Sequence, residues 1–120
     1  MDKWQAQQAF WSGYNIPAYD VASVPENAEL PYITYQAAID SLDNVIALTG
    51  DIYYLSNNSW AEISQKAEEI SQDLENSKTI KTAKGFLKIT RGSPFAQRVM
   101  ENYDYLKHIT IYVNAEYFSK

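Results

Sequence analysis

The chain has 120 residues, of which 46% are hydrophobic and 21% charged, a composition typical of one globular domain spanning residues 1–120. It contains no cysteine, which excludes disulfides, thiolate metal sites and cysteine nucleophiles, and no segment approaches the roughly 20 apolar residues of a membrane helix. The formal net charge of −5 gives the chain no general attraction for nucleic-acid phosphates.

The charge is distributed unevenly along the chain. Residues 1–58 carry seven acids and one lysine, a net charge of −6. Residues 59–78 carry five acids and two lysines, a net of −3, whereas residues 79–120 carry seven bases and three acids, a net of +4. This pattern indicates either ordinary solvated faces or a bipolar surface suited to head-to-side self-association.

The first predicted element is a helix over residues 2–12. Asp2 is suited to cap its first turn, and the spacing predicts that Trp4, Gln8 and Trp11 share one face. An irregular stretch follows, because Gly, Asn and Pro residues punctuate the next part of the chain.

Strands are predicted over residues 18–21, 31–39 and 51–56. Alternate residues of the 31–39 segment share one face, namely Ile33, Tyr35, Ala37 and Ile39. The link over residues 40–50 is compatible with an extension of either neighbouring strand or with a short helical turn. The aromatic content of these segments is typical of strands and of interfaces.

The clearest amphipathic helix is predicted over residues 59–75. Ser59 and Glu62, three residues apart, have the spacing of a capping box at its start. Behind them apolar residues recur at spacings of three and four: Trp60, Ile63, Ala67, Ile70 and Leu74. This stripe must be buried against another element.

The last third of the chain predicts a hairpin over residues 79–91, turning at 83–85, and a strand over 106–118. The Arg-Gly-Ser-Pro segment at 91–94 is expected to end the hairpin strand, with a loop or distorted edge over 92–105. The predicted fold class is therefore α+β: a single, mostly antiparallel sheet of about four or five strands, packed against two helices on one face.

No catalytic or cofactor-binding constellation is evident. His108 is the single histidine, lies on the polar face of the last predicted strand and has no ligand-spaced neighbours, so we predict no catalytic residue, no metal site and no cofactor. The four glycines are isolated, which excludes a glycine-rich phosphate loop. We therefore predict that the chain is not an enzyme.

Four bases cluster beside Phe86, namely Lys81, Lys84, Lys88 and Arg91, and the last three of them are the candidate self-association surface. Two other interpretations stay open: a local nucleic-acid patch beside Phe86, and a solvated edge hairpin whose lysines discourage strand pairing. No sequence-specific nucleic-acid binding is expected from an acidic chain of this kind.

Several phrases of the sequence occur in an order and spacing that resemble one protein family. They are FWSGYNIPAY at 10–19, SVP at 23–25, LPYITY at 30–35, SW at 59–60, GFLKITRGSPFAQ at 85–97 and ITIYVNAEY at 109–117. Together they resemble the tail terminator, or tail completion, proteins of phages with long non-contractile tails, which are often described as minor capsid proteins of prophages.

This resemblance implies a structural role and an α+β fold. Family members form a ring, typically hexameric, at the head-proximal end of the tail tube, where the ring stops tube growth and docks to the head connector. The implied partners are copies of the chain itself, the major tail tube protein and the head–tail connector protein, with the genome passing through the ring. The implied location is the head–tail junction of the virion, after assembly in the host cytoplasm.

The resemblance carries no catalytic residues onto this chain. Head-completion proteins, which sit under the portal and are of similar size, remain an alternative. So do a small protein-binding module unrelated to phages and a small hydrolase with an unrecognised site.

Overall fold

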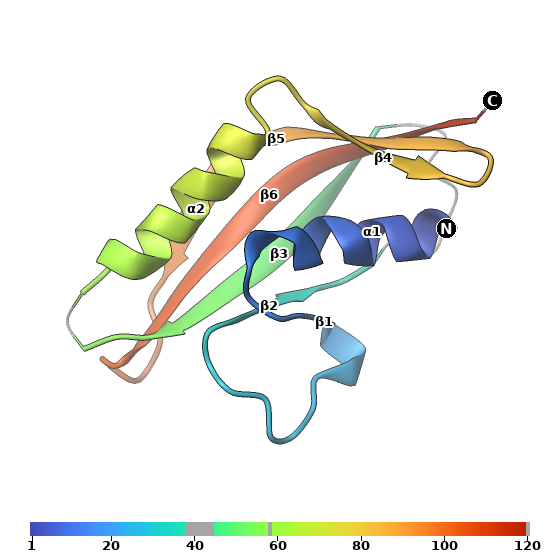
Figure 1. Cartoon of the computed structure of the whole chain (residues 1–120). Helices are drawn as coiled ribbons and strands as arrows, with labels where there is room; N and C mark the ends of the chain where they lie inside the picture. The colour runs from blue at the N-terminus through green and yellow to red at the C-terminus, as the bar shows by residue number, and fades with distance from the viewer. Residues whose placement is uncertain (38–44, 58, 120) are drawn as a thin grey trace.

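The computed structural model describes residues 1–37, 45–57 and 59–119, in which a curved sheet carries two helices on one side (Figure 1). The helices are α1 (Lys3–Trp11) and α2 (Ala61–Asp73), with short 3-10 turns η1 (Ser12–Tyr14) and η2 (Val21–Ser23). The strands are β1 (Ala18–Asp20), β2 (Tyr32–Tyr35), β3 (Ile46–Leu55), β4 (Lys78–Thr82), β5 (Gly85–Val99) and β6 (Leu106–Ser119).

The predicted α+β class with one sheet and two helices is confirmed, but the predicted number of strands is too low. The sheet has six strands in the order β1-β2-β3-β6-β5-β4. All neighbouring pairs are antiparallel except β1 and β2, which are parallel. The sheet is therefore mixed rather than purely antiparallel, because the chain between β1 and β2 crosses back to the starting end.

The two faces of the sheet differ in what covers them. Side chains alternate along each strand, and residues paired across strands share a face. The face under α1 and α2, here called the helix face, buries Leu48, Ile52, Leu87, Ile89, Ile109, Ile111, Val113 and Ala115. The opposite face, called the open face, carries the polar and aromatic residues that alternate with them.

Helix α1 starts as predicted but buries a different face. The Asp2 carboxylate accepts from the Gln5 backbone N–H at 2.8 Å, and the Gln5 side chain accepts from the Asp2 N–H at 3.0 Å, which completes a capping box. The buried residues are Ala6, Gln7, Phe10 and Trp11. The expectation that Trp4 shares the inner face is wrong, since its side chain is 45% exposed.

Gly50 lets the Trp11 ring lie directly against the sheet. A Cβ atom at position 50 would lie 2.5 Å from Cζ3 of Trp11, a separation that real Cβ atoms do not show. Trp11 is 1% exposed and stacks on Tyr35, whose hydroxyl donates to the side chain of Gln8. A small residue in β3 therefore fixes the position of α1 through the largest side chain of the core.

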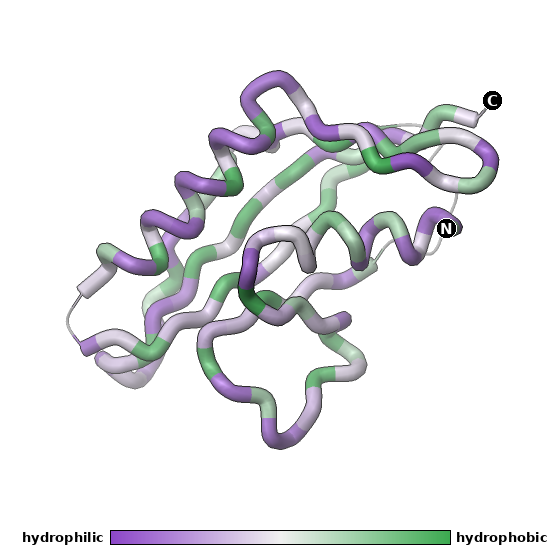
Figure 2. Tube along the Cα trace, viewed as in Figure 1, coloured by the Kyte–Doolittle hydropathy of each residue, from purple (hydrophilic) through white to green (hydrophobic). Residues whose placement is uncertain are grey.

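Helix α2 packs with the predicted stripe. Ile63, Ala67, Ile70 and Leu74 are buried and Trp60 is partly buried. Hydrophilic residues follow the outward side of the helix in Figure 2. The periodicity of three and four thus identified the buried face correctly.

The predicted capping box at the start of α2 is wrong. The helix begins at Ala61 with Trp60 in the N-cap position, and the Ser59 hydroxyl accepts from the Ala61 N–H at 3.2 Å. Trp60 packs against the core and beneath the Arg98 guanidinium, so the side chain that docks on the core sets where the helix starts.

The first half of the sheet differs from prediction in its strand lengths. β2 spans four residues and leaves Ala37 outside, whereas β3 begins at Ile46 and absorbs the second half of the ambiguous link. β3 is longer than predicted because all ten residues pair with β6, from Ile46↔Ala115 to Leu55↔Leu106. Ile39 and the remainder of the link lie within residues 38–44, outside the described residues.

The hairpin and the last strand are confirmed, but the predicted break at 91–94 is wrong. β5 continues to Val99, with a register shift between Arg91 and Ala96, so of the two alternatives predicted for 92–105 the distorted edge describes 92–99, and a loop is confined to the residues after Val99. Gly92 lets the β5 backbone lie close against β6 at this register shift, since a Cβ at position 92 would be 2.7 Å from the Tyr112 carbonyl oxygen. β6 pairs with β5 on both sides of this shift, from Gly85↔Ser119 to Arg91↔Val113 and from Ala96↔Ile111 to Val99↔His108.

Both helices are short relative to the thickness of a bilayer. α2 is the longer of the two at 13 residues. None of the described helices is long and apolar enough to cross a membrane.

Candidate functional site

A row of aromatic rings crosses four strands on the open face. Tyr19 of β1, Tyr32 of β2, Tyr53 of β3 and His108 of β6 follow one another with ring centroids 5.9, 5.6 and 4.3 Å apart. Tyr32 pairs with Tyr53, and Tyr53 with His108, directly across neighbouring strands, so the sheet register itself builds the row. Both helices lie on the other side of the sheet (Figure 1), which leaves the row without a helical cover in the described part of the chain.

His108 closes this row between two carboxylates. Its Nε2 lies 2.7 Å from Asp51 Oδ1, and its Nδ1 lies 2.7 Å from Glu101 Oε1. The Thr110 hydroxyl also donates to Asp51 Oδ1 at 2.7 Å. Both ring nitrogens face acceptors, so the arrangement is satisfied when His108 is an imidazolium that donates from both nitrogens. We call Asp51, His108 and Glu101 the charge triad.

Two opposing effects act on the pKa values of the triad. Burial alone would lower the pKa of His108, but the hydrogen bonds and charges of Asp51 and Glu101 outweigh it and hold that pKa above its ordinary value. Burial would raise the pKa of Asp51, but the hydrogen bonds from His108 and Thr110 prevail and hold it below its ordinary value. Both shifts favour the ionised triad at neutral pH.

The triad corrects the sequence interpretation of His108. The sequence placed this residue on the polar face of the last strand with no neighbours at ligand spacing, whereas it is 8% exposed and has two carboxylate neighbours. The carboxylates lie at opposite edges of the imidazole ring, so they do not converge on a single point. Among the described residues no cluster of three or more His, Cys, Asp or Glu side chains is arranged to hold a metal ion.

The three residues of the predicted self-association surface do not share one face. Lys84 lies in the exposed β4–β5 turn, and Lys88 lies on the open face opposite Glu116 of β6. Arg91 lies on the helix face, where its guanidinium donates to the Ser71 hydroxyl of α2 at 3.1 Å. The open face instead brings Lys81 of β4 beside the first two, since Lys81 pairs with Phe86.

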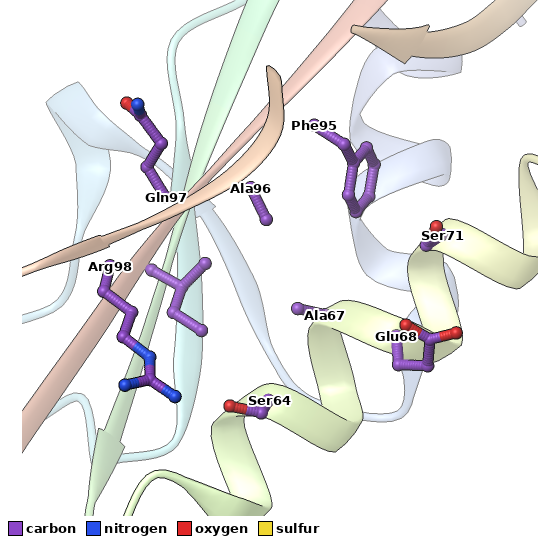
Figure 3. A pocket seen from close by; sticks show the side chains of 9 residues that line it. Ser64, Ala67, Glu68, Ser71, Phe95, Ala96, Gln97 and Arg98 are labelled. Carbon is purple, nitrogen blue, oxygen red and sulfur yellow. The ribbon is translucent and has the colours of Figure 1, made fainter. Parts of the chain in front are cut away.

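A pocket of about 230 Å³ lies between α2 and the second half of β5 (Figure 3). Ser64, Glu68 and Ser71 of α2 line one side and Arg98 lines the other, with Ile109 between them. His108, the single histidine of the chain, lies on the other face of the sheet, so neither serine has an imidazole base beside it. The pocket offers hydrophobic contact and one residue of each charge.

The sequence reasoning missed the two carboxylate partners of His108 and the aromatic row. The signal available was alternation: Asp51 and Tyr53 fall on the same face of one strand, and His108 and Thr110 on the same face of another. Joining them requires the register between β3 and β6, which pairs Asp51 with Thr110 and so brings it diagonally to His108, 57 residues away in sequence. Periodicity within one strand does not supply that register.

Comparison with known proteins leaves the chain without a family assignment. No protein-family model matches the sequence. A search of curated proteins also finds no significant match.

Proposed function

We propose that this chain is a structural assembly subunit of the tail terminator type, which forms a ring at the head-proximal end of a long non-contractile phage tail. In that position it stops growth of the tail tube and joins the tail to the head connector. The observation that carries the proposal is the polarised open face, with the aromatic row and charge triad at one end and the lysines of the β4–β5 hairpin at the other.

The chemistry of this face suits a protein interface. Tyrosines combine a large apolar ring with a polar tip and are enriched where proteins meet. The triad carries two carboxylates and one imidazolium, a net charge of −1, whereas Lys81, Lys84 and Lys88 are exposed cations. A ring joins one patch to a different patch, so ends of opposite charge set the direction of assembly.

The proposed partners follow from the same role. They are further copies of the chain in a ring, the major tail tube protein and the head–tail connector protein. The genome passes through the ring without base-specific contacts. The role is non-enzymatic and belongs to the virion. A head-completion protein would use the same surface against the portal side, and binding to isolated tail tubes separates the two roles.

The test exploits the separation of the basic residues onto two faces. The double variant Lys84→Glu with Lys88→Glu reverses the charge of the open face, and Arg91→Glu is its matched control on the helix face. We expect the double variant to leave heads and tails unjoined when it replaces the natural protein in a phage, while the control still yields infectious particles.

Circular dichroism establishes that both variants fold. Full infectivity of a folded double variant would contradict the charge-directed ring. Equal loss in both variants would show that overall charge, rather than the open face, decides the outcome.

A further inference from the structure

Exposed apolar side chains gather at the turn between β5 and β6. Met100 is 82% exposed, Tyr103 57%, Tyr105 45%, and Leu55 at the end of the adjoining strand 60%. These four are half of the eight large hydrophobic residues that are exposed in the described ranges. We call them the tip. Contiguous exposed apolar surface of this kind marks a protein interaction site.

The tip is held in a fixed shape. The Ser56 N–H donates to the Tyr105 carbonyl at 2.8 Å, and the Leu106 N–H donates to the Tyr103 carbonyl at 3.1 Å. The Lys107 ammonium donates to the Asp104 carbonyl, and Glu101 is tied to the sheet through His108. The Tyr103 and Tyr105 rings stack with centroids 5.3 Å apart. A surface ordered before binding loses little conformational entropy when a partner docks.

The opposite end of the sheet carries a complementary surface. The Ala83 N–H donates to the Met1 carbonyl at 2.9 Å, which places the exposed Met1 beside the β4–β5 turn and Lys84. Exposed Val45 lies beside Lys88. We call Met1, Val45, Lys84 and Lys88 the hairpin end. It pairs exposed apolar side chains with cations, whereas the tip carries Glu101 and exposed Asp104.

We infer that the tip of one copy of this chain docks onto the hairpin end of a second copy. In this contact apolar side chains of the two copies pack together, which supplies affinity. The tip carboxylates face Lys84 and Lys88, and these opposite charges orient one copy relative to the other. The inference rests on the self-association that the proposed function includes, and it gives that self-association a specific geometry. It holds whether or not the resulting assembly belongs to a phage tail.

The two surfaces lie at opposite ends of the longest strand. Leu106 begins β6 at the tip, and Ser119 ends it opposite Gly85 at the hairpin end. The chain measures 48 Å along its longest axis, which is the direction of this strand in Figure 1. A contact between two different patches is heterologous, so repeated docking closes into a ring or grows into a filament.

The absence of native cysteine allows a direct test by engineered disulfides. Tyr103→Cys combined with Lys84→Cys places one thiol on each surface, too far apart within one copy to react. We expect oxidation to give a ladder of covalent dimers, trimers and larger species. The matched control combines Tyr103→Cys with Glu62→Cys, which lies on the outer side of α2. If the cross-links form in the proposed contact and not by random collision, the control should give at least about tenfold less covalent oligomer.

A charge exchange tests the same contact without covalent bonds. We expect Asp104→Lys alone, and Lys84→Glu alone, to weaken self-association about tenfold or more in sedimentation velocity, because each places like charges together. The two changes in one chain, or the two single variants mixed in equal amounts, should restore it. Recovery in the double variant would support the contact even where a single change lowers stability.

Two results would overturn the inference: equal cross-linking in the paired and control variants, or no restoration by the charge exchange. The outcome is separable from that of the proposed function. Cross-linked ladders from a protein that does not bind tail tubes would support this contact and contradict the phage role. Tail joining by a protein that fails both tests would leave the role supported and this contact wrong.

Discussion

Replacing His108 with Gln is the most informative single change in the charge triad. The imidazolium makes two hydrogen bonds to carboxylates, each 2.7 Å long, and bonds to charged groups contribute about 1.5–3 kcal/mol each. Gln keeps a bond to one carboxylate, whose charge leaves that bond in the same range of about 1.5–3 kcal/mol, so one charged bond is lost, and the carboxylates, 31% and 29% exposed, regain water. We therefore expect a loss of about 2 kcal/mol in the free energy of unfolding at pH 6.

The loss must depend on pH in a defined direction. The pKa of His108 is raised in the folded state, so its contribution is fully present below the unfolded value near 6.5 and disappears as the pH rises through the folded pKa. The pKa of Asp51 is lowered, so its contribution is present above about 3.9 and disappears as the pH falls through the folded pKa. The triad therefore stabilises the fold most between about pH 4 and 6.5.

Urea titrations of the natural chain and the variant at several pH values measure this difference. The gap should be widest near pH 6 and shrink to about 1 kcal/mol or less once His108 is neutral. Because the chain has one histidine, its ring signal in NMR reports the folded pKa without ambiguity. A His108 pKa below 6.5, or a loss equally large at pH 6 and above the folded pKa, would refute the reasoning.

Three further predictions concern the core and the absence of a metal. Ile70→Ala should cost about 2–5 kcal/mol in a urea titration because Ile70 is fully buried, whereas Glu69→Ala should cost well under 1 kcal/mol because the Glu69 side chain is 47% exposed. Gly50→Val should cost about 1–3 kcal/mol by forcing a side chain into the Trp11 ring, and Trp11→Leu in that background should recover part of the loss in thermal melts. Elemental analysis of untagged protein should find metal well below one equivalent; a stoichiometric ion would contradict the non-catalytic assignment.

Local patterns predicted most of the elements. The α2 stripe, the β4–β5 hairpin and the alternation of β6 each depend on residues close in sequence, and the structure confirms all three. Where sequence and structure differ, a distant contact decides. β5 resumes after the Gly-Ser-Pro segment because β6 offers paired residues on both sides of it, and α2 starts after Trp60 because that ring docks on the core.

The candidate site was less accessible from sequence than the fold. Lys88 and Arg91 are three residues apart in one strand, so alternation along that strand already places them on opposite faces, which the grouping of the three bases into one surface did not take into account. The charge triad joins β3, β6 and the turn that precedes β6, so it exists only once the strands are in register. The charge asymmetry was compatible with ordinary solvated faces as well as with a self-association surface, and the second of these stays a prediction.

The ring that we propose at the end of a phage tail tube has one direct test. Electron microscopy of the purified protein mixed with tail tubes lacking their terminator tests it most directly. We expect a ring at one end only, at the head-proximal terminus, with tubes no longer able to elongate. Bare tube ends, or rings distributed along the tubes and at both ends, would contradict the claim.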